Sequence, residues 1–134
     1  MPSFSQRSQD KLNTCDKRIQ DIMNEVIQHL DITIVSGMRG AVEQDSLYEK
    51  GFSKVKFPNS KHNHNPSLAV DVCIYNKEKP HIRWDDKNQF CYMVGYIKSV
   101  ADRLGIKIRM GADWNGDMLF NESFFDGAHI EVAE

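Results

Sequence analysis

The chain lacks the features that mark several large classes of protein. Among its 134 residues are only three cysteines, Cys15, Cys73 and Cys91, whose odd number and wide spacing suit reduced, buried thiols better than a disulfide framework. No long apolar run occurs, and the first ten residues have neither the apolar core of a signal peptide nor that of a membrane anchor. We therefore expect a soluble protein made in the cytoplasm.

An excess of positive charge is also missing. The 17 lysines and arginines are outnumbered by 19 aspartates and glutamates, which gives a net charge of −2. Such a balance offers no basic surface to a polyanion, so nucleic acid is not expected as a partner. A chain of this length can bury a core without disulfides, and we expect one domain spanning residues 1–134.

The apolar pattern predicts helices packed on a small sheet. Apolar residues recur at three- and four-residue steps over residues 12–30 and again over 85–104, which is typical of helices with one buried face. A short helix is expected at 41–50, and β-branched or alternating segments predict strands at 32–36, 68–75, 106–110 and 129–132. Residues 52–66 and 111–127 read as loops. The fold class is therefore α+β.

Histidines and carboxylates in three of these segments suggest a metal site. Asp71 lies in the middle of an apolar strand, where a buried carboxylate needs a cation, a set of donors or a metal. His62 and His64 lie in the preceding polar loop, and His129 begins the last strand. Two imidazoles and a carboxylate make an open zinc centre with a coordination position for water. Asp126 is then a candidate base for that water.

Some neighbouring residues allow more than one interpretation. Glu131, in phase with His129, is either a second carboxylate on the same face or a residue that faces solvent, and the alternation of the strand favours solvent.

The run His62-Asn63-His64-Asn65 spells the name of a nuclease motif, but in those nucleases the letters are spread over a hairpin and a helix, and no basic surface is present here. No pair of acidic residues is singled out for one cleft, as a lysozyme requires.

Several short motifs together resemble one known family. They are Val35-Ser36-Gly37-Met38-Arg39, Ser60-Lys61-His62, Ala69-Val70-Asp71-Val72, Gly111-Ala112-Asp113-Trp114-Asn115 and Asp126-Gly127-Ala128-His129-Ile130-Glu131. In this order they resemble the zinc D-alanyl-D-alanine carboxypeptidase and L-alanyl-D-glutamate endopeptidase family, and most of all its bacteriophage endolysins. The resemblance covers residues 32–132. It implies a Hedgehog-like α+β fold with a small antiparallel sheet.

The resemblance also implies a role for each matching residue. His62, Asp71 and His129 match the ligands of one zinc ion per chain. Asp126 matches the catalytic acid that takes a proton from the attacking water and passes it to the leaving amine. Arg39 matches the arginine that binds the oxyanion. Further residues that match positions in the cleft or in contact with substrate are Ser60, Asp113 and Trp114.

The chain departs from the family's pattern at the first ligand. The common spacing of seven positions to the aspartate fits His64, whereas His62 stands nine positions before Asp71. Only His62, however, has the family's serine two residues before it, at Ser60. We predict His62 as the ligand, with a two-residue insertion in the loop, and His64 stays open as the alternative.

The function implied by the resemblance is that of a phage endolysin. It would cleave the L-alanyl-D-glutamate bond of the peptidoglycan stem peptide during host lysis, as a monomer without a membrane anchor. It would act on the cell wall after leaving the host cytoplasm through a separate membrane-permeabilising step. One alternative is a D-alanyl-D-alanine carboxypeptidase. Another is a non-catalytic zinc-binding domain, which would retain the ligands but lose Asp126 or Arg39.

Overall fold

Four antiparallel strands form the sheet that organises the chain, in a computed structural model that describes residues 2–133. The strands are β1 (Ile32–Ser36), β2 (Ala69–Ile74), β3 (Ile108–Met110) and β4 (His129–Val132), and their order across the sheet is β1-β2-β4-β3. The predicted α+β class and small antiparallel sheet are confirmed. The predicted domain also includes Met1 and Glu134, which lie outside the described residues.

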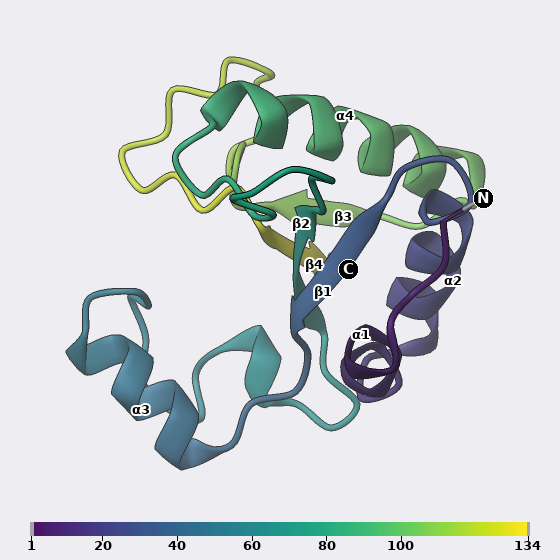
Figure 1. Cartoon of the computed structure of the whole chain (residues 1–134). Coiled ribbons are helices and arrows are strands. Elements are labelled where there is room, and N and C mark those ends of the chain that lie inside the picture. Colours follow the sequence, from purple (N-terminus) through teal and green to yellow (C-terminus); the bar gives the residue numbers. More distant parts are fainter. Residues whose placement is uncertain (1, 134) are drawn as a thin grey trace.

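Helices cover the sheet and supply most of the core. The long helix α4 (Lys87–Arg103) packs on β2 and β3 with α2 (Lys17–Val26) beside it (Figure 1), and α1 (Gln6–Leu12) packs against β1. The apolar stripes of α2 and α4 are buried, as their periodicity predicts. The core side chains from these two helices include Ile19, Ile22, Met23, Met93, Val94 and Ile97. Within residues 2–133 no helix is long and apolar enough to cross a membrane.

The helix predicted over residues 12–30 is too long: it corresponds to α2, which ends at Val26, and the chain breaks between Leu12, the last residue of α1, and Lys17. After α1 the Thr14 hydroxyl donates to the carbonyl oxygen of Lys11 at 2.6 Å, and the Asp16 side chain caps the start of α2 by accepting from Arg18 N. Cys15, between them, pairs with Ser67 as an isolated bridge. Cys15 is nevertheless buried, so the apolar periodicity continues across the break and hides it.

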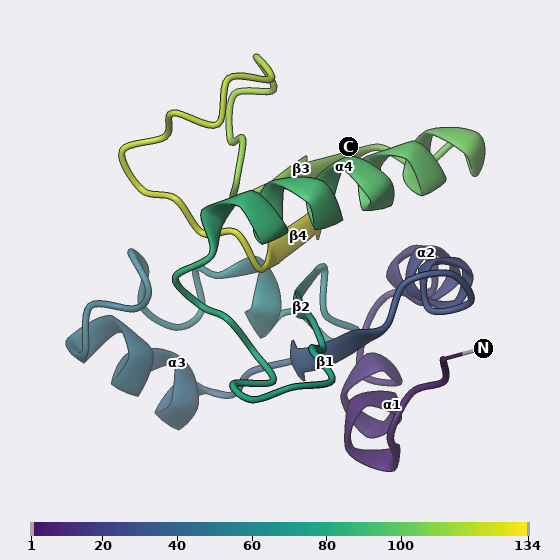
Figure 2. The same ribbon diagram turned by 45° about the horizontal axis from the view of Figure 1, so that its top comes forward.

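The segment between β1 and β2 stands apart from the other helices. Helix α3 (Ala41–Glu49) projects away from the sheet (Figures 1 and 2), and Gln44 is its buried residue. The predicted loop at 52–66 contains a short 3₁₀ helix, η1 (Lys61–Asn63). Opposite this segment, the long connection from β3 to β4 forms a second projection (Figure 2). Both projections leave the sheet at the end where β1 finishes and β4 begins.

Candidate metal centre

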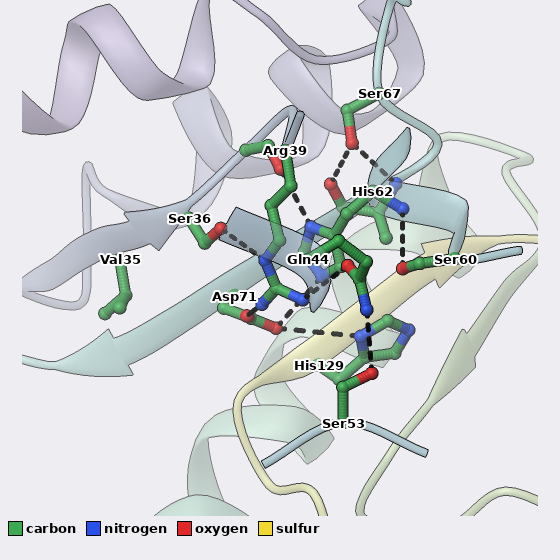
Figure 3. A network of polar contacts seen from close by, with 12 residues as sticks. Val35, Ser36, Arg39, Gln44, Ser53, Ser60, His62, Ser67, Asp71 and His129 are labelled. Atoms are coloured by element: carbon green, nitrogen blue, oxygen red, sulfur yellow. Dashed lines mark hydrogen bonds and ion pairs between the residues drawn. The ribbon is translucent and has the colours of Figure 1, made fainter. Parts of the chain in front are cut away.

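Three side chains from separate elements converge at that end of the sheet (Figure 3). Asp71 of β2 is directly opposite His129 of β4 in the antiparallel register, so the two side chains share one face. His62 approaches from η1, and each of the three side chains offers a ligand atom within 4.8 Å of the others. All three residues are buried. Strand register and one short turn therefore assemble the group.

The His62 ring is held with one nitrogen free. Its Nδ1 lies 2.8 Å from the carbonyl oxygen of Gly37, to which only a protonated nitrogen can donate, so Nε2 of the neutral ring is an acceptor. Nε2 lies 3.3 Å from Asp71 Oδ1, and neither atom has a hydrogen-bond partner among the described residues. Two buried acceptors that face each other favour a cation between them. The group therefore fits a metal ion.

Glu131 holds the second imidazole, and the prediction that it faces solvent is wrong. Its carboxylate is buried and accepts a hydrogen bond from His129 Nε2 at 2.8 Å. His129 Nδ1 is thereby left 3.6 Å from Asp71 Oδ1. Burial opposes charge on His129, but its contacts with the two carboxylates outweigh burial and raise its pKa to about 9. The alternating sequence pattern predicted one exposed face for β4, but the strand is buried on both faces.

Arg39 reaches the other oxygen of Asp71 from the turn after β1. Its Nη2 forms an ion pair with Asp71 Oδ2, while Nε donates to Ser36 Oγ at 3.0 Å and Nη1 to Gln44 Oε1 at 3.4 Å (Figure 3). Burial would raise the pKa of Asp71, but its contacts with the two histidines and Arg39 hold that pKa well below its usual range. A guanidinium carries five N–H donors, so Arg39 retains donors beyond these three contacts.

A turn directly before β4 places Asp126 near the same group. Its backbone N–H donates to Gly111 O at 2.9 Å, and its carbonyl oxygen accepts from His129 N at 3.1 Å. A Cβ on Gly111 would lie 2.2 Å from Asp126 O, so this close approach requires glycine. Burial, followed by the negative charge of Asp71, raises the pKa of Asp126. A carboxyl with a raised pKa is suited to proton transfer near neutral pH.

Ser60 and His64 lie on either side of η1, outside the group of His62, Asp71 and His129. The Ser60 hydroxyl accepts from His62 N at 3.1 Å and caps η1, while its own N–H donates to Asn63 Oδ1. The serine thus fixes the turn that carries the first histidine. His64 follows η1, is exposed and does not belong to the buried group. Geometry therefore brings His62, and not His64, to Asp71.

Asp113 and Trp114 lie in the connection between β3 and β4. The Asp113 carboxylate accepts two backbone N–H groups of its own loop, at 3.2 and 2.9 Å, and so shapes that loop. The Trp114 ring centroid lies 5.2 Å from that of His129, and its Nε1 donates to Phe124 O at 2.8 Å. Trp114 therefore packs beside the metal-binding group, whereas Asp113 acts within the loop.

A second set of acidic side chains occurs in this loop. Asp113, Asp117 and Glu122 can bring one carboxylate oxygen each to within 4.8 Å of one another. Oxygen-only sets of this kind suit hard divalent cations. Exposed acidic groups are common on loops without an ion, however, and both Asp113 oxygens already accept backbone hydrogen bonds. The set therefore carries no assignment.

Comparison with known proteins gives a match along nearly the whole chain. Residues 2–133 match a family model described as phage L-alanyl-D-glutamate peptidase. The L-alanyl-D-glutamate peptidase of Escherichia phage T5 is 30% identical over 136 residues, a match that covers 97% of this chain and 97% of the relative.

A solved structure has the same fold. The crystal structure of the Serratia marcescens L-Ala D-Glu endopeptidase ChiX superposes with a TM-score of 0.77 and 17% sequence identity. The superposition covers 98% of this chain and 90% of that one. The α+β architecture described above is therefore one that a solved protein also adopts.

Proposed function

Because the chain belongs to the phage L-alanyl-D-glutamate peptidase family, we propose that it hydrolyses the amide bond between L-alanine and D-glutamate in the peptidoglycan stem peptide. The observation that carries this proposal is the buried group of His62, Asp71 and His129, whose free ligand atoms face one another. Asp126, with a raised pKa, lies close to the group. Amide hydrolysis needs both an electrophilic centre and a group that moves a proton.

The three side chains would hold one zinc ion per chain. The ligand atoms would be Nε2 of His62, Oδ1 of Asp71 and, after loss of its proton, Nδ1 of His129. Two imidazole nitrogens with a carboxylate oxygen are a common ligand set of catalytic zinc. Glu131 and the Gly37 carbonyl orient the two rings by binding their other nitrogens. A bound zinc ion supplies Lewis acidity, which lowers the pKa of water and polarises a carbonyl group.

Asp126 is the proposed general base and acid. Its carboxylate would accept a proton from the attacking water and then donate it to the leaving nitrogen of D-glutamate. Burial and the Asp71 charge support this role, because they make the Asp126 carboxylate a stronger base than an exposed aspartate. Its side chain has no hydrogen-bond partner of its own among residues 2–133, so both oxygens are available for the transfer.

Arg39 is the proposed partner of the oxyanion. Its guanidinium is fixed by Ser36, Gln44 and Asp71, so its remaining N–H donors point in a set direction before substrate arrives. A fixed cation of this kind stabilises the charge that develops on the scissile oxygen and requires no reorganisation during the reaction. Trp114, Ser60 and Asp113 support the site through the contacts described above.

Membership of the family supports a proposal for the biological setting. The protein would be a phage endolysin that degrades host peptidoglycan during lysis, acting on the wall after a separate step has permeabilised the membrane. Its partner would be the stem peptide, and a single chain carries all the residues that the mechanism uses. One chain is therefore sufficient for activity, as in a monomer.

Mass spectrometry of digested peptidoglycan tests the proposal. We expect the protein to release stem-peptide fragments that begin with the free amino group of D-glutamate and to leave L-alanine on the glycan. The Asp126→Asn variant serves as the control, because it retains the metal-binding group. Release of terminal D-alanine alone would instead identify a carboxypeptidase. A protein that binds zinc and yields no peptide products would be a non-catalytic zinc domain.

A further inference from the structure

A shallow surface depression near the start of α4 lies outside the residues that the hydrolytic mechanism uses. It is lined by Pro80, Ile82, Arg83, Trp84, Asp85 and Asp86. Trp84 is 57% exposed, although a large aromatic side chain gains free energy from burial. Apolar surface beside a few polar groups is typical of small-molecule sites.

The polar groups of this depression are free to bind a ligand. Neither the Arg83 guanidinium nor the Asp85 carboxylate has a hydrogen-bond or ion-pair partner in the part of the chain that the structure describes. Arg83 offers only donors, and Asp85 offers only acceptors. Together they flank an exposed ring with both kinds of hydrogen-bonding group.

A row of aromatic rings connects the depression to the catalytic turn, which is the turn before β4 that carries the proposed base Asp126. The ring centroid of Trp84 lies 6.2 Å from that of Phe90, which in turn lies 6.5 Å from that of Phe125. Phe125 directly precedes Asp126 in the chain. A Cβ on Gly127 would lie 2.6 Å from Phe90 Cγ and 2.8 Å from Phe125 Cε1, so the rings pack tightly against this turn. In Figures 1 and 2 the start of α4 accordingly lies beside the loop that leads into β4.

The chemistry of the substrate places a sugar near the bond that is cut. In peptidoglycan, L-alanine is the first residue of the stem peptide and is joined to muramic acid through its lactyl group. One extended residue spans at most about 3.6 Å, so one alanine and a lactyl group hold the sugar within roughly 10 Å of the scissile bond. A sugar is therefore held near the turn that carries Asp126 when the stem peptide is bound at the metal group.

We propose that the depression around Trp84 binds a sugar ring of the glycan strand while the stem peptide occupies the catalytic centre. One face of an N-acetylhexosamine ring carries mainly C–H groups and stacks on Trp84. Its hydroxyl and acetamido groups are within the hydrogen-bonding capacity of Arg83 and Asp85. This inference rests on the proposed function, because the sugar is part of the same substrate.

A pair of soluble substrates tests the inference. One is the disaccharide-linked stem peptide, and the other is the same peptide without sugars. We expect the protein to cleave the sugar-linked peptide with a kcat/KM about fivefold to tenfold higher, a gain of the size that aromatic stacking provides. The Trp84→Ala variant should lose this preference while its rate on the sugar-free peptide stays unchanged. The Trp84→Phe variant should retain part of the preference.

A matched control is available on the same helix. Tyr92 is 67% exposed and does not line the depression, so Tyr92→Ala should leave the preference unchanged. Equal kcat/KM values of the unmodified protein on the two substrates would overturn the inference. So would an equal loss on both substrates in Trp84→Ala, since that result indicates a structural role. If the unmodified protein cleaves neither substrate, the proposed function fails and the sugar site fails with it.

Discussion

At the scale of single residues, the candidate metal site depends on the partners of each side chain in the group of His62, Asp71 and His129. The Gly37 carbonyl and Glu131 each occupy one nitrogen of a histidine, and this leaves the opposite nitrogen free to face Asp71. The orientation of both rings is therefore set by the fold before a metal binds. The cost is a buried cluster of charges whose members shift one another's pKa values.

The Asp126→Asn variant separates catalysis from stability. Asparagine cannot accept the proton of the attacking water, so turnover should fall by about two to four powers of ten. Because the pKa of Asp126 is raised in the fold, this carboxyl contributes stability only at acidic pH and loses it as pH rises through the folded pKa. At neutral pH the metal-free variant should therefore have a higher Tm than the metal-free parent.

Thermal unfolding at two pH values checks the second part of this prediction. The gain in Tm should be largest near neutral pH and should shrink toward about pH 3, where aspartate is protonated in both folded and unfolded chains. Unchanged turnover in Asp126→Asn would assign the base to another residue. A lower Tm at neutral pH would show that the charged carboxylate is stabilised in the fold.

Removing the Glu131 carboxylate should weaken the metal site without removing a ligand. Substitution of a residue that orients a ligand typically costs about 10- to 100-fold in metal affinity, so we expect Glu131→Ala to bind zinc that much more weakly. Glu131→Gln should lose less, because its amide oxygen can still accept from His129 Nε2. Competition with a fluorescent chelator measures both affinities. Equal affinity in Glu131→Ala and the parent would refute the orienting role.

At the scale of elements, two close approaches of the backbone position the site. Gly37 follows β1, and a Cβ on it would lie only 2.4 Å from Lys11 O and 2.4 Å from Thr14 Oγ1, so there is no room for a side chain. Gly111 follows β3 and packs against Asp126. The ends of β1 and β3 are therefore fixed against neighbouring segments of the chain. The first fixed end holds the Gly37 carbonyl that contacts His62, and the second holds the backbone of Asp126.

Gly111→Ala should disturb the catalytic turn and leave the ligands in place. The new Cβ would collide with Asp126 O and shift its carboxylate, and a misplacement of about 1 Å can cost up to about 100-fold in rate. Gly95→Ala is the control, because this residue is exposed in α4 and a Cβ there would meet no neighbouring group within 4 Å. The control should gain about 0.5–1 kcal/mol of stability at unchanged turnover. Full turnover in Gly111→Ala would contradict the positioning of Asp126 by this contact.

Apolar periodicity in the sequence predicts some parts of the fold and of the candidate site, and misses others. Periodicity locates the strands and α4, because one buried face repeats at a fixed interval in such elements. It misses the break before α2, where α1 ends at Leu12, Asp16 caps the start of α2, and buried Cys15 preserves the pattern. It also misplaces Glu131, because alternation cannot distinguish solvent from a second buried face. The turn that presents His62 depends on contacts of Ser60 and Asn63, which periodicity does not encode.

At the scale of the whole molecule, the sheet and its helices form a base from which two projections rise beside the metal centre. One holds α3 and the residues after it, and the other is the loop between β3 and β4 (Figure 2). The two projections meet where Lys54 Nζ lies 5.0 Å from the ring centroid of Phe124. The base is tightly packed, and the group of His62, Asp71 and His129 lies at the end of the sheet from which both projections leave.

The central claim is that His62, Asp71 and His129 hold the zinc ion that drives the reaction. Native mass spectrometry of the purified protein, with a parallel chelator test of activity, examines it most directly. We predict about one zinc per chain in the unmodified protein and in His64→Ala, and none in His62→Ala. Activity should disappear with chelator and return with zinc. Zinc-free protein with chelator-insensitive activity, or loss of zinc in His64→Ala and not in His62→Ala, would contradict the account.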